Sequence, residues 1–212
     1  RTRRYEQWLE GTYYLVADHP LGPWRVPDHD VIAGCRAHAP LAARVQRVGG
    51  DLLFYAWGPR RRALGLPMRI VVDQSGQLGA GWWRGVEALL TGDVCPGRPE
   101  PRSGVWKQED QLVGRAQDVA AVAGYGVEVE DFVATARVEP GPGAMPGLGI
   151  AQGASTLAAV IDPAAQVARV MRLPERHVLG ETPLPLPSEG QIELRLVADG
   201  EVLTLFVNER FA

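Results

Sequence analysis

Alternating apolar and polar positions run through most of the chain and predict strands rather than helices. The pattern is clearest near the end, where Leu194, Leu196 and the apolar run at 202–207 repeat with a period close to two. An Asp199-Gly200 pair separates these runs, and this dipeptide between alternating segments is the strongest short signal for a β-hairpin. We therefore expect the chain to end in sheet.

Strand-turn-strand units also repeat in the first 90 residues. The expected strands are residues 11–17, 42–48, 52–57 and 68–72, the last continuing into a hairpin at 73–78. The turns between them are rich in glycine and proline, because proline presets φ and glycine supplies the left-handed region. Antiparallel meanders at this spacing are typical of a propeller blade or a β-sandwich.

Residues 91–104 carry so many glycines and prolines that we expect a linker there, without a regular element. After it the expected strands are residues 127–130, 131–138, 147–152, 156–161 and 166–171, followed by the closing hairpin. Residues 86–90 and 118–122 are expected to form single helical turns. Short strands without helical periodicity argue for a two-sheet sandwich. The expected organisation is therefore residues 1–90, a linker at 91–104, and a sandwich at 105–212.

Composition narrows the class of protein. The chain has 212 residues, 46% of them hydrophobic, with 25 glycines and 17 prolines, and this argues against an all-helical architecture. Its net charge of -3 comes from scattered residues, so nucleic acid is not an expected partner. No apolar run approaches the ~18 residues of a membrane span, and no signal peptide is evident. The start at Arg1 without methionine fits processing, trimming or a longer parent chain.

Cys35 and Cys95 are the two cysteines, and they form no disulfide framework. A single disulfide between them stays open, because the sequence does not fix the distance between their Cα atoms. The redox state of this pair, and with it the compartment, cytoplasmic or secreted, also stays open.

Two further classes of site find little support. His29, Cys35 and His38 lie near Asp28 and Asp30 with loosely ligand-like spacing, but the four tightly spaced ligands of a zinc site are not evident. We interpret this stretch as a loop. Ser75 and Ser155 lie in no Gly-x-Ser-x-Gly elbow, so serine hydrolase chemistry is not expected. We expect neither a metal nor a cofactor.

Several segments resemble a known family when they are taken together. Tyr13-Tyr14-Leu15 followed by Pro20-Leu21-Gly22-Pro23-Trp24 looks like a blade of the five-bladed propeller glycosidases. Residues 52–58, 66–73 and 76–78 are similar to the last blade of the glycoside hydrolase family that holds invertases, levanases and fructan hydrolases. Residues 131–138 and 147–150 look like the opening of its β-sandwich, and the hairpin ending Phe206-Val207-Asn208-x-Arg210 looks like its close.

The resemblance implies an all-β fold: the terminal blades of a partial five-bladed β-propeller, followed by a concanavalin-like β-sandwich. It also implies a retaining mechanism with two carboxyl groups roughly 5 Å apart, one a nucleophile and one a proton donor with a raised pKa. The family places the nucleophile in a Trp-x-Asn-Asp-Pro-x-Gly motif, a transition-state stabiliser in Arg-Asp-Pro and the acid/base in a Glu-Cys pair, and none of these motifs occurs in this sequence. No catalytic residue is therefore assigned, and the acids are expected upstream of Arg1.

The acids that the chain does contain have a simpler interpretation. Asp28, Asp30, Asp73, Glu87 and Asp131 mostly lie beside expected turns. Acidic side chains at such positions commonly cap the turn or remain solvated. We therefore expect structural roles for them.

Trp57 is the candidate for substrate binding, with Tyr55 on the same face of the expected strand. In the resembling family a tryptophan at this position lines the sugar pocket, and an aromatic face suits the C–H surface of a sugar. A core tryptophan between blades is an equally weighted alternative. Trp82 and Trp83 could form a surface platform for a sugar, but we favour a role in packing between the blade and the sandwich.

The function implied by the resemblance is hydrolysis or transfer at fructosyl or related glycosidic bonds. Whether the chain itself is an enzyme stays open, since it lacks the catalytic motifs. Two alternatives remain: a carbohydrate-binding or structural β-module without catalysis, and a degenerate propeller that has lost its acids. Carbohydrate is the expected partner, a membrane is not, and the oligomeric state is open.

Overall fold

The computed structural model describes residues 10–28, 30–35, 41–57, 65–73, 76–94, 97–108, 112–115, 121–128, 130–184, 186, 190–200 and 202–211. These residues form antiparallel strands and one 3-10 turn, so the expected all-β class is confirmed. The elements are β1 Glu10–Tyr13, β2 Val31–Cys35, β3 Leu41–Val48, β4 Asp51–Trp57, β5 Met68–Val72, β6 Leu78–Trp82, η1 Arg84–Leu89, β7 Glu100–Ser103, β8 Val105–Gln108, β9 Leu112–Arg115, β10 Val122–Gly124, β11 Phe132–Val138, β12 Gly147–Gln152, β13 Ser155–Asp162, β14 Val167–Leu173, β15 His177–Pro183, β16 Ile192–Asp199, β17 Val202–Val207 and β18 Arg210–Phe211.

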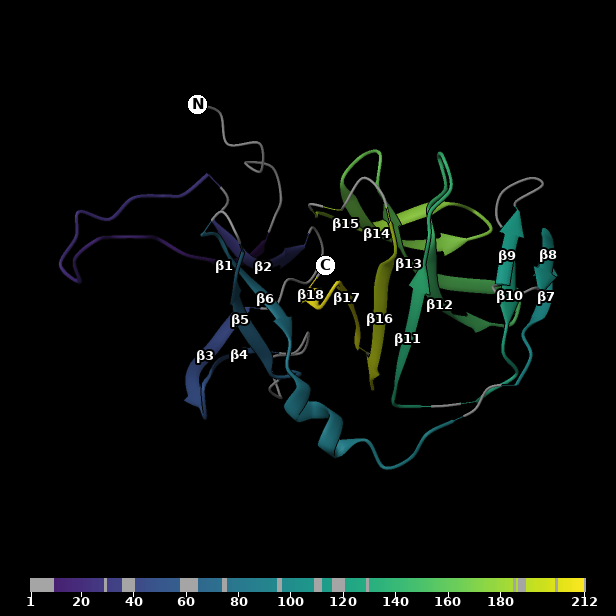
Figure 1. The fold of residues 1–212 in the computed structure, drawn as a ribbon, viewed down its shortest axis with the longest axis horizontal. Helices are drawn as coiled ribbons and strands as arrows, with labels where there is room; N and C mark the ends of the chain where they lie inside the picture. Colours follow the sequence, from purple (N-terminus) through teal and green to yellow (C-terminus); the bar gives the residue numbers. More distant parts are fainter. Residues whose placement is uncertain are drawn as a thin grey trace.

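An eight-stranded antiparallel sheet crosses the molecule (Figure 1). Its strand order is β11-β16-β17-β18-β6-β5-β4-β3, so the last strands of the chain lie in the middle of the sheet. A second sheet has the order β12-β13-β14-β15, and three two-stranded sheets pair β1 with β2, β7 with β10 and β8 with β9. Strands from both expected domains therefore share one sheet.

The hairpin β16–β17 has the strict alternation that the sequence predicts, and one of its faces packs on the four-stranded sheet. Leu194 and Leu196 on β16 and Leu205 and Val207 on β17 are buried against Ile161 of β13. The two sheets therefore enclose an apolar layer between facing side chains, which is the arrangement of a β-sandwich.

The opposite face of the same hairpin is buried in a second core. Val197 and Phe206 point to this side, where they join Phe54, Met68 and Trp82 of strands β4, β5 and β6. The rings of Trp82 and Phe206 meet edge to face, with 5.4 Å between their centroids. The hairpin is consequently covered on both faces, once by the sandwich and once by side chains of the β3–β6 meander.

A short seam joins the two halves of the long sheet. The Trp82 N–H donates to the Glu209 carbonyl at 2.7 Å, and Arg210 lies opposite Gly81. A Cβ at position 81 would lie 2.8 Å from the Glu209 carbonyl oxygen, so only glycine permits this approach of the two backbones. The Arg210 guanidinium then reaches Asp73 at 3.3 Å, across β6.

Most strand predictions are confirmed, with several corrections. The strand expected at 11–17 ends at Tyr13 as β1, and β2, β8, β9 and β15 lie outside the expected strands. Residues 127 and 128 form no strand, and β7 lies inside the expected linker at 91–104. A proline is tolerated in β7 because this strand pairs with β10 alone and has a free edge. Val122, expected in a helical turn, begins β10, whereas the expected turn at 86–90 is confirmed as η1. The division into domains and the propeller blades stay predictions.

No helix in the described ranges is long and apolar enough to cross a membrane.

We expect the two cores to unfold together because they share β16 and β17. Leu194→Ala in the first core and Phe206→Ala in the second should each lower the free energy of unfolding by about 2–5 kcal/mol. Leu89→Ala, at a side chain that is 71% exposed, should change it by about 0.5 kcal/mol or less. Denaturant unfolding measures these differences.

Hydrogen exchange checks the coupling between the cores. In Phe206→Ala, amides in β12–β15 should lose protection together with those in β3–β6, because one hairpin supports both groups of strands. Loss of protection confined to β3–β6 would contradict the shared core.

Candidate functional site

The segment between β1 and β2 leaves the body of the protein as a long arm, drawn in purple in Figure 1. Val16 and Arg25 hold its two sides together through paired backbone hydrogen bonds of 3.0 and 2.8 Å. At the tip, the Gly22 N–H donates to the His19 carbonyl at 2.8 Å and closes a turn. The arm, residues 15–28, therefore has a defined shape although it stands away from the core.

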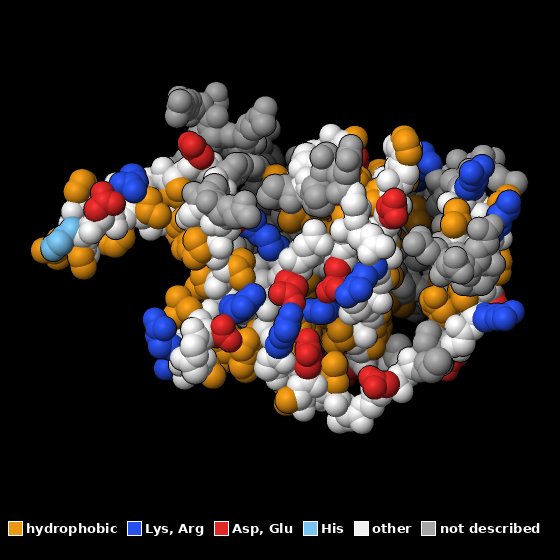
Figure 2. Space-filling model, in the orientation of Figure 1, with side chains coloured by type: hydrophobic (Ala, Val, Ile, Leu, Met, Phe, Trp, Pro, Cys, Tyr) orange, Lys and Arg blue, Asp and Glu red, His pale blue; other side chains and the backbone are white. Residues whose placement is uncertain are grey.

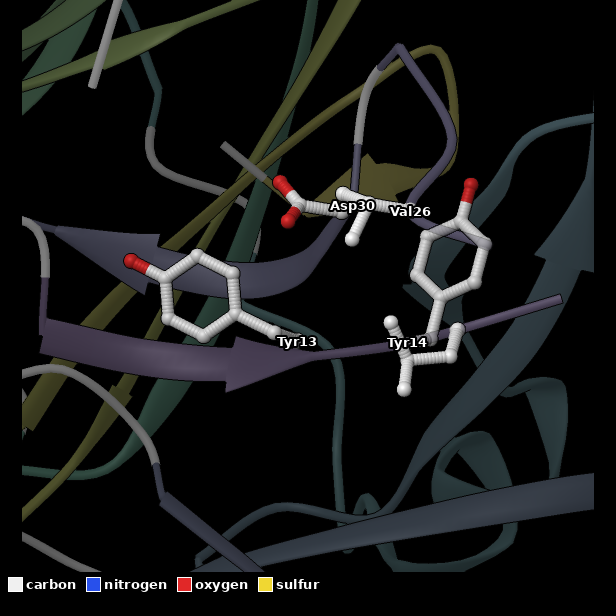
Figure 3. A pocket seen from close by; sticks show the side chains of 5 residues that line it. Tyr13, Tyr14, Val26 and Asp30 are labelled. Carbon is white, nitrogen blue, oxygen red and sulfur yellow. The ribbon is translucent and has the colours of Figure 1, made fainter. Parts of the chain in front are cut away.

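A hollow of about 380 Å³ lies at the base of this arm. It is lined by Tyr13, Tyr14, Leu15, Val26 and Asp30 (Figure 3). The two sides come together because the Tyr14 N–H donates to the Asp30 carbonyl at 2.8 Å. The hollow thus combines aromatic and aliphatic walls with one carboxylate.

The two tyrosines have different roles in the hollow. Tyr14 is buried, and its hydroxyl accepts a hydrogen bond of 3.0 Å from the Leu78 N–H, which ties the base of the arm to β6. Tyr13 is 44% exposed, and Figure 3 shows its ring and the Asp30 carboxylate on the same side of the opening. An aromatic face beside a hydrogen-bond acceptor suits a ligand with C–H faces and hydroxyl groups, such as a sugar.

The residues that the sequence singled out for binding lie on another element. Tyr55 and Trp57 belong to β4, and Tyr55 is half-buried opposite Arg44 of β3. The Trp57 side chain lies outside the described residues, so its role in a sugar pocket stays a prediction. Tyr55 is not among the residues that line the hollow.

Sequence reasoning did not join Tyr13 to Asp30. In the sequence, Tyr13 belongs to the segment that resembles a propeller blade, and Asp30 is one of the acids near an expected turn. The signal that brings them together is the pairing of β1 with β2, which sets Tyr13 opposite Val31, the residue after Asp30. That register depends on an irregularity between Thr12 and Tyr13, and the sequence pattern does not show it.

Two of the five acids cap turns, as expected. The Asp73 carboxylate accepts from the Gln77 N–H at 3.0 Å, and the Asp131 carboxylate accepts from the Gly200 N–H at 2.7 Å in the closing hairpin. Glu87 accepts from the Trp82 indole N–H at 2.9 Å. Asp28 is exposed and Asp30 lines the hollow.

The described acids do not form a metal site, since no group of three or more potential ligands occurs among them and the described histidines and cysteines. His29, His38, Ser75 and Cys95, and the side chain of Cys35, lie outside the described residues. The loop interpretation of this stretch and the question of a disulfide therefore stay as the sequence left them.

Two carboxylates do lie close together around Arg169, on strands β13 and β15. Arg169 donates to Asp162 and to Glu181, each at 2.7 Å. A hydrogen bond from the Ala165 N–H, together with the Arg169 guanidinium, holds the pKa of Asp162 below its usual range. A retaining glycosidase needs a proton donor with a raised pKa, whereas the pKa of Asp162 is lowered. Because both carboxylates bind Arg169, we interpret the cluster as structural.

Trp82 is a packing residue, as the preferred interpretation of Trp82-Trp83 stated. Its ring is 1% exposed and touches Phe206, while the Arg195 guanidinium carbon lies 4.6 Å from the ring centroid. The indole is covered on the side of the sandwich hairpin and has its N–H bound to Glu87. It therefore offers no platform for a sugar.

A smaller hollow of about 200 Å³ lies over the seam, beside Arg69, Asp73, Glu209 and Arg210. Its charges pair with one another: Arg210 with Asp73 at 3.3 Å, and Glu209 with Arg84 at 3.1 Å and with Arg69 at 3.8 Å. Figure 2 shows acidic and basic side chains interleaved across the middle of the face in view. The arrangement clamps β18 onto the sheet.

The Asp162 pair makes a prediction about pH. Asp162→Asn should lower the free energy of unfolding at pH 7 by about 1–2 kcal/mol, because a charged acceptor on Arg169 is lost. A lowered pKa in the folded state stabilises above the pKa near 4 of the unfolded state, and this contribution disappears as pH falls through the folded value. The difference from wild type should therefore shrink toward pH 3.

Denaturant unfolding at the two pH values measures this change. Asp18→Asn is the matched control, because Asp18 also binds an arginine, Arg25, but in a pair whose side chains are 62% and 88% exposed. That variant should differ little from wild type at either pH. A deficit for Asp162→Asn that stays constant with pH would contradict the assignment.

The sequence matches no model of a known protein family, and no curated protein matches it significantly. The function is therefore inferred from the hollow, the arm and the order of the strands.

Proposed function

We propose that this chain binds carbohydrate in the hollow at the base of the arm, as part of a retaining glycoside hydrolase that acts on fructosyl or related bonds. The observation that carries the proposal is that the exposed Tyr13 ring and the Asp30 carboxylate both line one hollow. The ring takes the apolar face of a sugar, and the carboxylate accepts hydrogen bonds from its hydroxyl groups.

The order of the strands supports the class of enzyme. The strands β3, β4, β5 and β6 are neighbours in chain order, as in the four-stranded antiparallel blade of a propeller. A two-sheet layer follows them in the chain, in the order expected from the resemblance to invertases, levanases and fructan hydrolases. The closing hairpin with its Asn208-Glu209-Arg210 end lies at the junction of the two parts.

Catalysis in this proposal needs carboxylates that the motifs of this sequence do not supply. The nucleophile would attack the anomeric carbon while a second carboxylic acid protonates the leaving oxygen, and water would then release the sugar from the enzyme. Asp162 and Glu181 are bound to Arg169, and Asp73 and Asp131 cap turns. The contribution of this chain is therefore substrate binding and support.

A carbohydrate-binding module without catalysis is the second candidate. The observation that favours it is that Asp162 and Glu181 bind Arg169 and that Asp131 binds a turn amide, which leaves these acids poorly suited to proton transfer. Both candidates share sugar binding in the hollow. They differ in whether the protein cleaves the sugar that it binds.

Sugar binding is tested by titration of the protein with inulin, levan or sucrose. Tyr13→Ala should weaken binding about tenfold, because loss of an aromatic contact of about 1.4 kcal/mol corresponds to that factor. Tyr125→Ala is the matched control, since Tyr125 is 46% exposed and distant in sequence from the hollow. It should bind as wild type does.

Asp30→Asn tests the contribution of the carboxylate charge while it preserves the shape of the hollow. The amide keeps one oxygen acceptor and loses the charge, so binding should weaken while the fold, followed by circular dichroism, stays unchanged. Equal sugar affinity in wild type, Tyr13→Ala and Asp30→Asn would remove the hollow from the proposal.

Hydrolysis is tested by release of fructose from the same sugars by the intact protein. If Trp57 lines a sugar pocket, as the resemblance implies, then Trp57→Ala should raise KM for the sugar more than it lowers kcat. Binding without any release of fructose would support the module instead of the enzyme.

A further inference from the structure

The arm presents large apolar side chains to solvent on both of its sides. Leu21 is 87% exposed and Trp24 is 57% exposed, and Leu15 and Val26 closer to the body are also exposed. Figure 2 shows these orange side chains along the arm, apart from the rest of the surface. Residues of this kind, gathered on one projecting element, mark an interaction site.

The tip of the arm is held in one conformation. Gly22 has a φ of +91°, and a Cβ there would lie 3.0 Å from the Trp24 ring, so the indole packs against the bare backbone of the turn. The Leu21 N–H donates to His19 Nδ1 at 3.2 Å, and Arg25 pairs with Asp18 at 3.2 Å. The indole is therefore preorganised outside the body, which lowers the entropic cost of inserting it into a partner.

The exposed area of the arm approaches what one half of an interface requires. Five apolar side chains of the arm and its base are 44–87% exposed: Tyr13, Leu15, Leu21, Trp24 and Val26. A large apolar side chain presents roughly 150–250 Å² when fully exposed, so together they expose on the order of 500 Å². Two such arms supply the about 1,000 Å² of total surface that distinguishes a specific interface.

We propose that two copies of this chain exchange arms, so that Trp24 of each copy enters the hollow lined by Tyr13, Leu15, Val26 and Asp30 of the other. The arm and the hollow belong to one continuous segment between β1 and β2. One two-fold rotation therefore relates the two contacts, each between the arm of one copy and the hollow of the other. Such an assembly closes as a dimer and does not extend into a fibre.

The charges at the two surfaces are complementary. Asp30 is the carboxylate of the hollow, and no described residue pairs with it through its side chain. Arg25 follows Trp24 on the arm, and its present partner Asp18 is 88% exposed, so that pair contributes little. Insertion of Trp24 brings Arg25 to the rim of the hollow, where it pairs with Asp30 at a site shielded from water.

The dimer is measured on the full chain by sedimentation equilibrium over a range of protein concentrations. Wild type should be a concentration-dependent dimer, and Trp24→Ala should raise the dimer dissociation constant at least tenfold. Leu89→Ala is the matched control, since it removes an exposed apolar side chain away from the arm. A wild-type chain that stays monomeric, or a dimer that Trp24→Ala leaves unchanged, overturns the proposal.

A charge exchange tests the geometry of the contact. In an Asp18→Asn background, which removes the competing carboxylate, Arg25→Asp and Asp30→Arg should each weaken the dimer, and the two together should restore it. If Trp24→Ala weakens the dimer but neither charge reversal changes the dissociation constant, the arm docks elsewhere. That result overturns the exchange of arms into the hollow.

This inference uses the same hollow as the proposed function, so Trp24 of the other copy and a sugar compete for it. The two proposals are tested separately, because the measurement of assembly contains no sugar. If the arm takes a different protein as its partner, the chain alone stays monomeric at all concentrations, and the exchange between copies is overturned. Titration of the monomeric Trp24→Ala variant with sugar then tests carbohydrate binding separately from assembly.

Discussion

The structure depends on the burial of the β16–β17 hairpin on both of its faces. Leu194, Leu196 and Val207 point into the sandwich, whereas Val197 and Phe206 point to Trp82 and the β3–β6 meander. A strand with one buried face tolerates polar residues on the other, whereas the second face of this hairpin also carries buried apolar side chains, Val197 and Phe206. The hairpin contributes buried side chains to both cores, so its removal would expose apolar surface in each of them.

Charged groups complete the junction where apolar packing ends. Arg195 is on the same face as Val197, and its guanidinium covers the Trp82 ring while it donates to Glu193 at 3.2 Å. The Glu193 backbone in turn exchanges hydrogen bonds of 2.9 Å with Asn208, at the turn that leads to β18. One Arg195 nitrogen, Nη1, is buried without a hydrogen-bond partner among the described atoms, which is the cost of placing an arginine against an indole. These contacts surround β18, which joins β17 to β6 within the long sheet.

The side chains of the two cores are packed against one another, so the arm and its base are the better place for a binding site. Tyr14 ties the base of the arm to Leu78 of β6, so the hollow and the arm start from a supported position. Asp162 and Glu181 are bound by Arg169 and Asp131 by a turn amide, and the rings of Trp82 and Phe206 are packed in the core. Tyr13 and Trp24 are exposed and Asp30 is half-buried, and the proposed sugar site and the proposed contact between copies use these three residues.

The sequence by itself determined the all-β class, most of the strands from β3 to β6 and from β11 to β17, and the Asp199-Gly200 turn, because period-two alternation and turn dipeptides are local signals. It also indicated structural roles, turn capping or solvation, for the acids beside the expected turns. The tertiary structure alone decided that β18 pairs with β6 and that both faces of the last hairpin are covered, since alternation shows which residues share a face but not what lies on it. The hollow was equally beyond the sequence: Tyr13 and Asp30 meet only through the irregular register of β1 with β2, which depends on backbone hydrogen bonds between distant residues.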